Sequence, residues 1–491
     1  MKQIYFYLLF VFLLRTFVYA QAPDTLWTRS YNNPPDNNDW AQNCVVDDSG
    51  NLYVIGWSDD GGTNICLSVK YNTATGDTAW TSRNKGPLNL LAVGYGCAID
   101  YLGNLYVTGY SQNGMGDGCL TMKYNTITGD TVWARLYNGL SNNNAYGTGC
   151  AADDAGNIYS SGYSLSVSNV DYLVIKYIGA TGDTAWTRMY NGPDDNDDFS
   201  MGCAVDSSGN LYVTGWSKNG ANNDYLTIKI NTATGDTLWA RSYNGPADST
   251  DNAFGCVVDG MGNLYVTGGS HNGINMDYLT IKYNAVTGDT LWTRRYNGPA
   301  DGSDIAYACA VDGSGNLYVT GSSSNGLNNN YLTVKYNTNT GDTVWSCRYY
   351  GIANSGSAKG CAVDKLGNLY VTGYSPISAT YDYLTIKYNT ATGVEGKPEL
   401  PMTVSKLRLE QNKPNPFSQH TTISYQLPTS GPASLNIYNA AGQLVKTFNI
   451  GHQQTGYHQV EWSDSSIPAG VYFYRLIAGN YQATKKLIVV K

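Results

Sequence analysis

A repeat of about 53 residues fills most of this 491-residue chain and limits its possible folds more than any other feature. Six copies of the repeat contain the segment Gly-Asn-Leu-Tyr-Val, and a seventh copy, at Gly156, contains the variant Gly-Asn-Ile-Tyr-Ser. Successive copies are 53 residues apart five times and then 52. Self-similarity with a period near 50 residues is typical of solenoids, propellers and related arrays. The segment Gly-Asn-Leu-Tyr-Val itself begins at Gly50, Gly103, Gly209, Gly262, Gly315 and Gly367.

Each repeat has the pattern of four short strands. In the unit that starts at Gly202, runs of alternating or small apolar residues are separated by turns and by one polar loop. Four antiparallel strands in about 50 residues are typical of one propeller blade. The strands are expected at 202–206, 211–216, 225–230 and 237–243.

The two ends of the repeat array predict how the ring closes. A fourth-strand copy, Asp-Thr-Leu-Trp at 24–27, precedes any first strand, and the last unit ends near Thr392 without a fourth strand. Placing 24–32 on the outer edge of the blade built from 360–389 would close the ring and cover an exposed strand edge. We therefore predict an all-β fold with a seven-bladed β-propeller over 21–392, whose N-terminal strand completes the last blade.

Two residue types recur once per unit, which predicts equivalent surroundings in every blade. We expect the cysteines of the first strand to be small, buried, unpaired thiols rather than disulfides. The tryptophans of the fourth strand should fill the wide outer gap between blades. The cysteines are Cys44, Cys97, Cys150, Cys203, Cys256, Cys309 and Cys361, and the tryptophans are Trp27, Trp80, Trp133, Trp186, Trp239, Trp292 and Trp345.

The first 20 residues have the pattern of an export signal. Lys2 supplies the positive start, 4–14 are apolar, and Val18-Tyr19-Ala20 fits a cleavage site, so we predict cleavage after Ala20. Eleven apolar residues are too few to span a bilayer, which needs about 20. No later stretch is long and apolar enough either, so we expect no transmembrane segment.

The charge of the chain divides into two parts. Residues 21–404 hold 20 Lys and Arg against 35 Asp and Glu, a net −15, whereas 405–491 carry a net +5. An acidic propeller argues against nucleic acid as a partner, because nucleic acid is bound through Lys and Arg. It is compatible with cation binding.

A second domain follows the repeats. Residues 393–405, with Pro398 and Pro401, read as a linker, and 406–491 contain six alternating strands. This pattern predicts a small Ig-like β-sandwich. The strands are expected at 422–427, 433–438, 444–450, 458–462, 471–478 and 481–490.

The repeat core resembles that of a known family. Val-Asp-x-x-Gly-Asn-Leu-Tyr-Val-Thr-Gly is similar to bacterial seven-bladed β-propeller repeats, which implies a scaffold with no fixed activity. The Thr-Gly-Asp-Thr-x-Trp stretch also looks like the tryptophan-docking motif of quinoprotein propellers, which would imply an enzyme. The chain lacks the adjacent cysteine pair that quinoprotein dehydrogenases use.

The C-terminal domain resembles the sorting domain of type IX secretion over about 85 residues. The resemblance implies that the type IX secretion machinery is a partner and that the protein is secreted or attached to the outer cell surface. An Ig-like accessory domain that binds sugar or protein is the alternative. The lysines and the arginine of the motif would face the machinery, although lysines in a final strand can also protect an edge from aggregation. The matching residues are Pro414, Asn415, Pro416, Phe417, Gly470, Tyr472, Arg475, Lys485 and Lys486.

No catalytic residue can be assigned from the sequence. The propeller contains one histidine, His271, in a polar loop, and we find no blade that differs from the others in the way a single active site requires. Aspartates that precede the tight turn of every unit, such as Asp206, are expected to cap it. We predict no cofactor other than calcium. The acidic loops between blades are suited to calcium, because this ion prefers oxygen ligands. The calcium candidates are Asp195, Asp198, Asp248, Asp251, Asp301 and Asp304.

The sequence favours a binding and interaction protein with a propeller scaffold, without deciding whether it is an enzyme. Asn- and Gly-rich loops between the second and third strands, such as 219–223 and 325–330, could hold a polysaccharide or a surface protein. The alternative is an extracellular polysaccharide hydrolase or lyase that uses carboxylates on the propeller face.

Overall fold

The computed structural model of the chain separates into two compact units, Met1–Gly396 and Lys397–Lys491. The predicted export signal (1–20) and linker (393–405) lie outside the described residues. The structure describes 23–33, 36–166, 169–192, 194–351, 353–376, 380–390, 408–409, 411–412, 414–427, 431–453, 456–463, 467–479 and 481–490.

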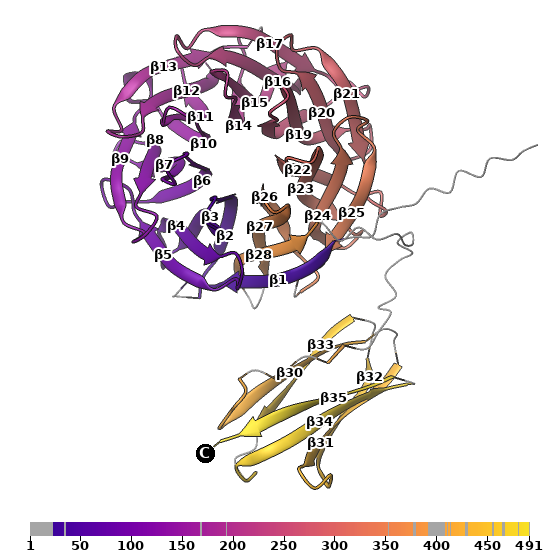
Figure 1. The fold of residues 1–491 in the computed structure, drawn as a ribbon. Coiled ribbons are helices and arrows are strands. Elements are labelled where there is room, and N and C mark those ends of the chain that lie inside the picture. The colour runs from indigo at the N-terminus through magenta and orange to yellow at the C-terminus, as the bar shows by residue number, and fades with distance from the viewer. Residues whose placement is uncertain are drawn as a thin grey trace, which may run out of the picture. The chain divides into compact units, whose positions relative to one another are not determined.

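The first unit is a ring of seven sheets, each with four antiparallel strands (Figure 1). This confirms the predicted seven-bladed propeller. We number the blades 1 to 7 in chain order, so that blade 1 begins with β2. A short 3-10 helix, Leu140–Asn142, lies between blades 2 and 3.

In every blade the strands run in order from the channel outward. The first, innermost strands are β2 (Asp39–Val46), β6 (Ala92–Ile99), β10 (Ala145–Ala152), β14 (Asp198–Val205), β18 (Asp251–Val258), β22 (Asp304–Val311) and β26 (Ser357–Val363). The second strands are β3 (Asn51–Asp59), β7 (Leu105–Gln112), β11 (Asn157–Leu165), β15 (Asn210–Asn219), β19 (Asn263–His271), β23 (Asn316–Ser324) and β27 (Asn368–Pro376). The third strands are β4 (Asn64–Asn72), β8 (Asp117–Tyr124), β12 (Val170–Ile178), β16 (Asn222–Asn231), β20 (Met276–Asn284), β24 (Asn329–Asn337) and β28 (Tyr381–Asn389). The fourth strands of blades 1 to 6 are β5 (Thr78–Asn84), β9 (Thr131–Tyr137), β13 (Thr184–Tyr190), β17 (Thr237–Tyr243), β21 (Thr290–Tyr296) and β25 (Thr343–Tyr349).

The N-terminal strand β1 (Asp24–Tyr31) is the fourth strand of blade 7. It pairs antiparallel with β28, from Asp24 opposite Asn389 to Tyr31 opposite Tyr383. The predicted closure of the ring by 24–32 is therefore confirmed. Closure removes the free edge that a three-stranded last blade would expose.

Each turn between a first and a second strand is organised by one aspartate. The Asp206 carboxylate accepts hydrogen bonds from the Ser208 and Asn210 backbone N–H groups at 3.0 and 2.8 Å, and from the Tyr212 hydroxyl at 2.9 Å. The other blades repeat this arrangement, so the predicted capping role is confirmed. The equivalent aspartates are Asp47, Asp100, Asp153, Asp259, Asp312 and Asp364.

Neighbouring blades are joined by a hydrogen-bonded tryptophan. The Trp133 indole N–H donates to the Gly179 carbonyl of the next blade at 3.0 Å, and the Lys123 ammonium donates to the same oxygen at 3.2 Å. Trp133 also packs against Tyr106 and Tyr177. The tryptophans therefore bind the blades together through packing and through donors, which agrees with the predicted filling role.

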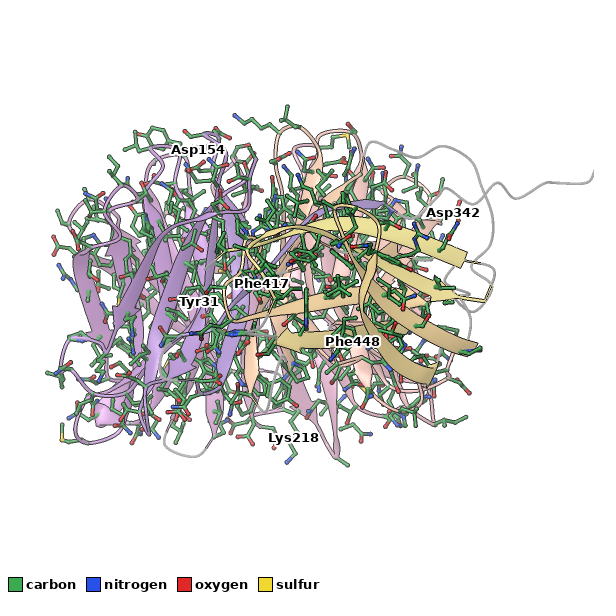
Figure 2. The ribbon with its side chains drawn as sticks, turned by 90° about the horizontal axis from the view of Figure 1, so that it is seen from below. Tyr31, Asp154, Lys218, Asp342, Phe417 and Phe448 are labelled. Atoms are coloured by element: carbon green, nitrogen blue, oxygen red, sulfur yellow. The ribbon has the colours of Figure 1, made fainter. Side chains whose placement is uncertain are left out.

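The two faces of the propeller carry different connections. Figure 2 shows Lys218, next to a loop between second and third strands, at the end opposite Asp154 and Asp342, which lie in turns. The loops between second and third strands contact those between blades, because the Asn222 side chain donates to the Asp248 carbonyl at 2.8 Å. We call the face with these two sets of loops the loop face.

The second unit contains two sheets, as predicted for a β-sandwich. All six expected strands are present, together with a short one that the sequence did not indicate. Its core includes Phe417, Ile423, Leu435, Trp462 and Tyr474. One sheet holds β29 (Arg408–Leu409), β30 (His420–Leu427) and β33 (Gly456–Ser463), and the other holds β32 (Leu444–Gln453), β31 (Gly431–Asn439), β34 (Gly470–Ala478) and β35 (Tyr481–Val489).

Candidate functional site

The innermost strand of every blade contains a β-bulge that turns one side chain into the central channel. In blade 4 the pairing of β14 with β15 skips Met201, which lies between Ser200 and Gly202. A bulge of this kind leaves the extra residue unpaired and redirects its side chain. The bulged residues of blades 1 to 7 are Gln42, Tyr95, Thr148, Met201, Phe254, Tyr307 and Lys359.

A glycine on the second strand makes room for each bulge. A Cβ on Gly215 would lie 1.9 Å from the Phe199 carbonyl oxygen, and the equivalent glycines have similar contacts of 1.8 to 2.0 Å. No larger residue fits without displacement of the inner strand. This explains the glycine of the repeated Val-Thr-Gly segment.

The seven bulged residues differ from blade to blade although the surrounding repeat is nearly constant. They include two tyrosines, one phenylalanine, one methionine, one lysine and two uncharged polar residues. The blades therefore differ from one another at this position. The repeat pattern hid the difference, because a single variable residue between two small ones gives no signal of its own.

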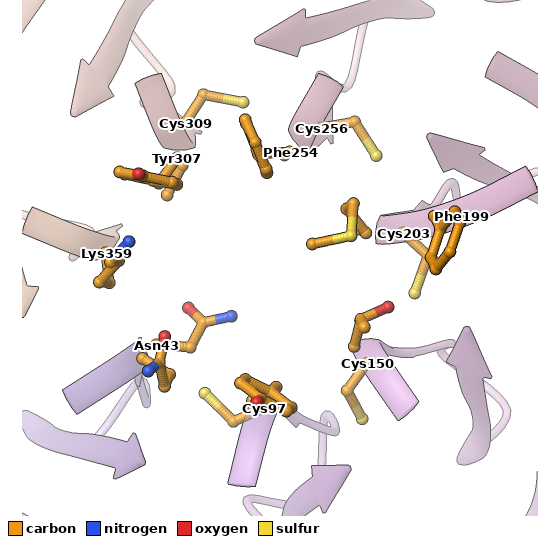
Figure 3. A pocket seen from close by; sticks show the side chains of 18 of the residues that line it. Asn43, Cys97, Cys150, Phe199, Cys203, Phe254, Cys256, Tyr307, Cys309 and Lys359 are labelled. Atoms are coloured by element: carbon orange, nitrogen blue, oxygen red, sulfur yellow. The ribbon is translucent and has the colours of Figure 1, made fainter. Parts of the chain in front are cut away.

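These side chains surround a cavity of about 580 Å³ in the channel, and all seven line it (Figure 3). Phe199 and Trp216, which also line it, lie near the loop face, because Phe199 is next to the start of β14 and Trp216 is near the end of β15. The cavity is therefore associated with the mouth of the channel on the loop face.

Aromatic rings form a nearly continuous wall along blades 2 to 4. Neighbouring ring centroids are 4.1 to 6.0 Å apart, and Phe199 stacks on Trp216 at 4.1 Å. Phe254 and Tyr307 continue the lining on blades 5 and 6, with centroids 5.1 Å apart. All of these rings are half-buried, and all of them except Tyr110 and Tyr146 line the cavity. The wall consists of Tyr95, Tyr110, Tyr146, Tyr163, Phe199 and Trp216.

Lys359 supplies the cationic side chain of the cavity lining. Its ammonium lies 3.3 Å from the centroid of the Tyr307 ring and 5.8 Å from that of Tyr374. Burial lowers the pKa of Lys359 to about 8. The residues that line the cavity include no carboxylate.

Six of the seven repeated cysteines also line the cavity. All seven are free thiols, as predicted. Burial raises their pKa, for example that of Cys203 to about 11 and that of Cys361 to about 12, so they are neutral thiols at pH 7. They are inert lining rather than nucleophiles.

The calcium candidates fall into two structural groups. Asp198, Asp251 and Asp304 begin first strands and are buried. Each accepts a hydrogen bond from a backbone N–H in the preceding loop, such as Gly245 to Asp251 at 2.5 Å.

The other three candidates adopt a left-handed backbone in the loops between blades. Asp195, Asp248 and Asp301 have φ of 47 to 51°. Each accepts a hydrogen bond from an asparagine side chain four residues earlier, as Asn244 does to Asp248 at 2.7 Å. Among the described residues, no three His, Cys, Asp or Glu side chains come together in a way that could hold a metal ion. Calcium binding by these six residues stays a prediction.

Each buried aspartate of the first strands has an acidic neighbour that sequence reasoning missed. The neighbour lies on the third strand of the preceding blade, where Asp171 faces Asp198 and Asp382 faces Asp39. The same pairing joins Asp224 with Asp251 and Asp277 with Asp304. The eight side chains are at most 7% exposed, and seven of them have a carboxylate oxygen without a hydrogen-bond partner.

The acidic pairs occur at four of the seven junctions between blades, and elsewhere both positions are uncharged. Burial and the neighbouring charge raise the pKa of Asp382 to about 7, and burial raises that of Asp39 to about 6. Only Asp277 has an ion pair, with Arg295 at 3.2 Å, among the paired aspartates that the structure describes. The uncharged pairs are Ile65 with Ala92, Gly118 with Ala145, and Asn330 with Gly356.

The opening of the predicted sorting motif is built into the core of the second unit. Phe417 is 2% exposed, its N–H donates to the Ile488 carbonyl at 3.0 Å, and its carbonyl accepts from Val490 N–H at 2.8 Å. The Asn415 side chain accepts from the Ile488 N–H at 2.8 Å. Pro414 and Pro416 flank Asn415, and the peptide bond before Pro416 is cis. The opening thus ties the start of the domain to its last strand.

The remaining motif residues lie on β34 and β35. Gly470 begins β34, and Tyr472 is buried with its hydroxyl donating to the Pro468 carbonyl at 2.9 Å. Arg475 is exposed and lies over the Tyr438 ring at 5.3 Å. Lys485 and Lys486 are also exposed on β35.

The exposed side of β34 is otherwise apolar. Val471, Phe473 and Ile477 alternate with buried residues and are 37 to 41% exposed. Together with Arg475 they give the sheet an outward face with apolar and cationic groups. Within the part of the chain that the structure describes, no helix is long and apolar enough to cross a membrane.

Two protein families match the sequence. Residues 414–490 match the family described as the secretion system C-terminal sorting domain. Residues 170–375, within the propeller, match the family described as outer membrane protein assembly factor BamB. No curated protein sequence matches the chain.

Several solved structures resemble the chain at a distance. PorZ, described as an essential bacterial surface component of the type-IX secretion system of human oral-microbiomic Porphyromonas gingivalis, has 13% identity and a TM-score of 0.46; the match covers 94% of this chain but 60% of PorZ. Polysaccharide lyase Uly1 has 13% identity and a TM-score of 0.44, over 73% of this chain and 91% of the lyase. Sqt1 of Chaetomium thermophilum has 9% identity and a TM-score of 0.46, over 76% and 99%.

Likenesses at these scores say nothing about ligand or activity. The family match at the C-terminus and the seven four-stranded blades do support an assignment. The chain is a seven-bladed β-propeller repeat protein with a type IX secretion sorting domain, which directs it to the cell surface or the extracellular space.

Proposed function

We propose that the exported propeller is a binding module without chemistry of its own, and that it holds a carbohydrate at the channel mouth on the loop face. The observation that carries this proposal is the non-repeating ring of bulged residues on an otherwise repeated scaffold. A ligand that contacts all seven blades at once meets seven side chains of six different kinds there. Such a site is specific even though each blade follows the same plan.

The lining supports a carbohydrate as the ligand. Half-buried aromatic rings such as Phe199 and Trp216 can pack against the C–H faces of sugar rings. Gln42, Asn43 and Thr148 offer amides and a hydroxyl for the hydroxyls of a sugar. A volume of about 580 Å³ is also within the usual range for small-ligand sites.

The absence of carboxylates from the cavity lining supports binding rather than hydrolysis. Glycoside hydrolysis normally needs two carboxylates that flank the scissile bond. The buried aspartate pairs do not meet this need, because they lie between blades and are closed to solvent.

The test is glycan binding by the full secreted chain, measured by calorimetry against a panel of extracellular oligosaccharides. We expect Phe199→Ala to weaken binding at least tenfold, because it removes the ring that stacks on Trp216. Tyr101→Ala is the matched control, since Tyr101 is 65% exposed in a turn between first and second strands, on the opposite face. Failure to bind any glycan, or equal losses in both variants, would refute the proposal, and release of shortened or unsaturated sugars would show an enzyme.

A further inference from the structure

We propose that the ligand of the channel mouth carries an anionic group and that Lys359 selects it, so that the ligand is an acidic carbohydrate such as one with uronic acid residues. This inference rests on the binding function proposed above and names the class of carbohydrate. It follows from the position of Lys359, from its lack of a counterion and from the composition of the cavity.

The scaffold does not need a lysine at this position. Lys359 is the bulged residue of blade 7, and the other six blades have glutamine, tyrosine, threonine, methionine, phenylalanine and tyrosine there. All seven bulges form with the same register shift. The lysine therefore contributes to the cavity and not to the formation of the blade.

The structural lysines of the propeller show what Lys359 lacks. Lys229 on a third strand lies 5.6 Å from the centroid of the Tyr212 ring and donates to the Ala285 carbonyl of the next blade at 2.9 Å. Five other blades repeat this carbonyl acceptor at 2.9 to 3.2 Å. Lys359 has a tyrosine ring but, among the residues that the structure describes, neither an oxygen acceptor nor an ion-pair partner.

The aromatic neighbours of Lys359 do not replace a counterion. The Tyr307 ring at 3.3 Å attracts the ammonium, as in other cation–π contacts. Burial nevertheless lowers the pKa of Lys359 to about 8, because no nearby negative charge compensates the loss of water. At pH 7 the group is still protonated, and a ligand carboxylate would supply the missing charge.

The rest of the cavity lining carries no negative charge that would repel an anion. Figure 3 shows Lys359 beside Tyr307 at the edge of the open channel, with Asn43 on the neighbouring blade. No carboxylate lines the cavity, and the cysteines there are neutral. The net negative charge of the propeller repels anions. One lysine can therefore select an acidic ligand only if that ligand also gains contacts with the aromatic wall.

The experiment compares charged and uncharged forms of the same oligosaccharide on the full secreted chain. The probes are trigalacturonate, a hyaluronate tetrasaccharide, and the methyl esters of both, which keep the sugar rings and remove the charge. We expect the wild-type protein to bind at least one acid at least tenfold more tightly than its ester at pH 7.

Two variants test the role of the lysine itself. Lys359→Met should reduce the preference for the acid over its ester to less than threefold, and Lys359→Arg should keep part of the preference. Lys365→Met is the control, because Lys365 is exposed and pairs with Asp48 away from the cavity. It should bind as the wild type does.

The wild-type comparison needs no variant to fold, so the inference can always be tested. Equal binding of acid and ester, or a preference for the acid that survives in Lys359→Met, would overturn the inference and leave the carbohydrate proposal standing. Binding of neutral glycans with no binding of either acid would do the same. Failure of every glycan to bind would instead refute the proposed function on which the inference rests.

Discussion

Replacing Asp382 with asparagine should stabilise the propeller at pH 8 and leave it nearly unchanged at pH 4. Asp382 and Asp39 face each other between blades 7 and 1, are 2% and 0% exposed, and each has an oxygen without a hydrogen-bond partner. Their pKa values are raised, to about 7 and about 6. The folded state therefore binds more protons than the unfolded state between about pH 4 and 7, so that its stability falls as pH rises through this window.

The size of the effect follows from the shift of Asp382. A rise of about three pKa units corresponds to about 4 kcal/mol of lost stability above pH 7, as an upper limit. Relaxation of the junction reduces this, and we expect Asp382→Asn to gain about 2 to 4 kcal/mol at pH 8. The asparagine N–H can also donate to the unpartnered oxygen of Asp39.

Urea unfolding between pH 4 and 8.5 measures this effect. Tryptophan fluorescence reports mainly on the propeller, because ten of the eleven tryptophans precede Trp462. Asp342→Asn is the matched control, since Asp342 is exposed in a turn and should give the same pH profile as the wild type. Wild-type stability that rises between pH 5 and 8, or a loss of stability in Asp382→Asn at pH 8, would refute the argument.

Three further predictions concern the scaffold and export. Trp133→Phe should lower the free energy of unfolding by about 1 to 2 kcal/mol, because it removes the donor to the Gly179 carbonyl while keeping an aromatic ring; urea unfolding measures it, and an unchanged midpoint would contradict it. Gly215→Ala should cost more than about 3 kcal/mol, because the new Cβ would lie 1.9 Å from the Phe199 oxygen; the soluble yield and melting temperature test this, and a wild-type melting temperature would disprove it. Deletion of 406–491 should abolish export, measured by the intact mass of protein in medium and on cells; normal export of the truncated chain would argue against the sorting role.

The fold was largely predictable because the repeat gives the same information seven times. The fourth-strand copy around Trp27 stood before any first strand, and only closure of the ring gives it a partner, which β28 provides. The cysteines and the turn aspartates were likewise predictable, because recurrence implies one environment for each.

The candidate site was not predictable, for two physical reasons. A residue such as Lys359 shows no periodicity, and its place in the channel depends on a bulge that strand patterns do not reveal. The partner of Asp198 is Asp171, on another blade, so their proximity depends on how blades pack and not on spacing along the chain. Sequence reasoning named one member of three of the four acidic pairs, Asp198, Asp251 and Asp304, as a calcium candidate, and it did not find the acidic neighbour on the preceding blade.

Closure of the ring by β1 also sets an order of events during folding. Residues 24–31 must wait for 381–389, the last propeller strand in the chain, before blade 7 can form. Loop-closure entropy opposes so distant a pairing, although this cost grows slowly with the length of the loop. Once the six intervening blades have stacked, they bring the two ends of the array close to each other. Until then the chain has an open edge at each end of the array, which is a template for aggregation and a target for proteases. The last propeller strand, β28, ends at Asn389, so a chain that stops soon after this residue is close to the shortest that can still close its ring.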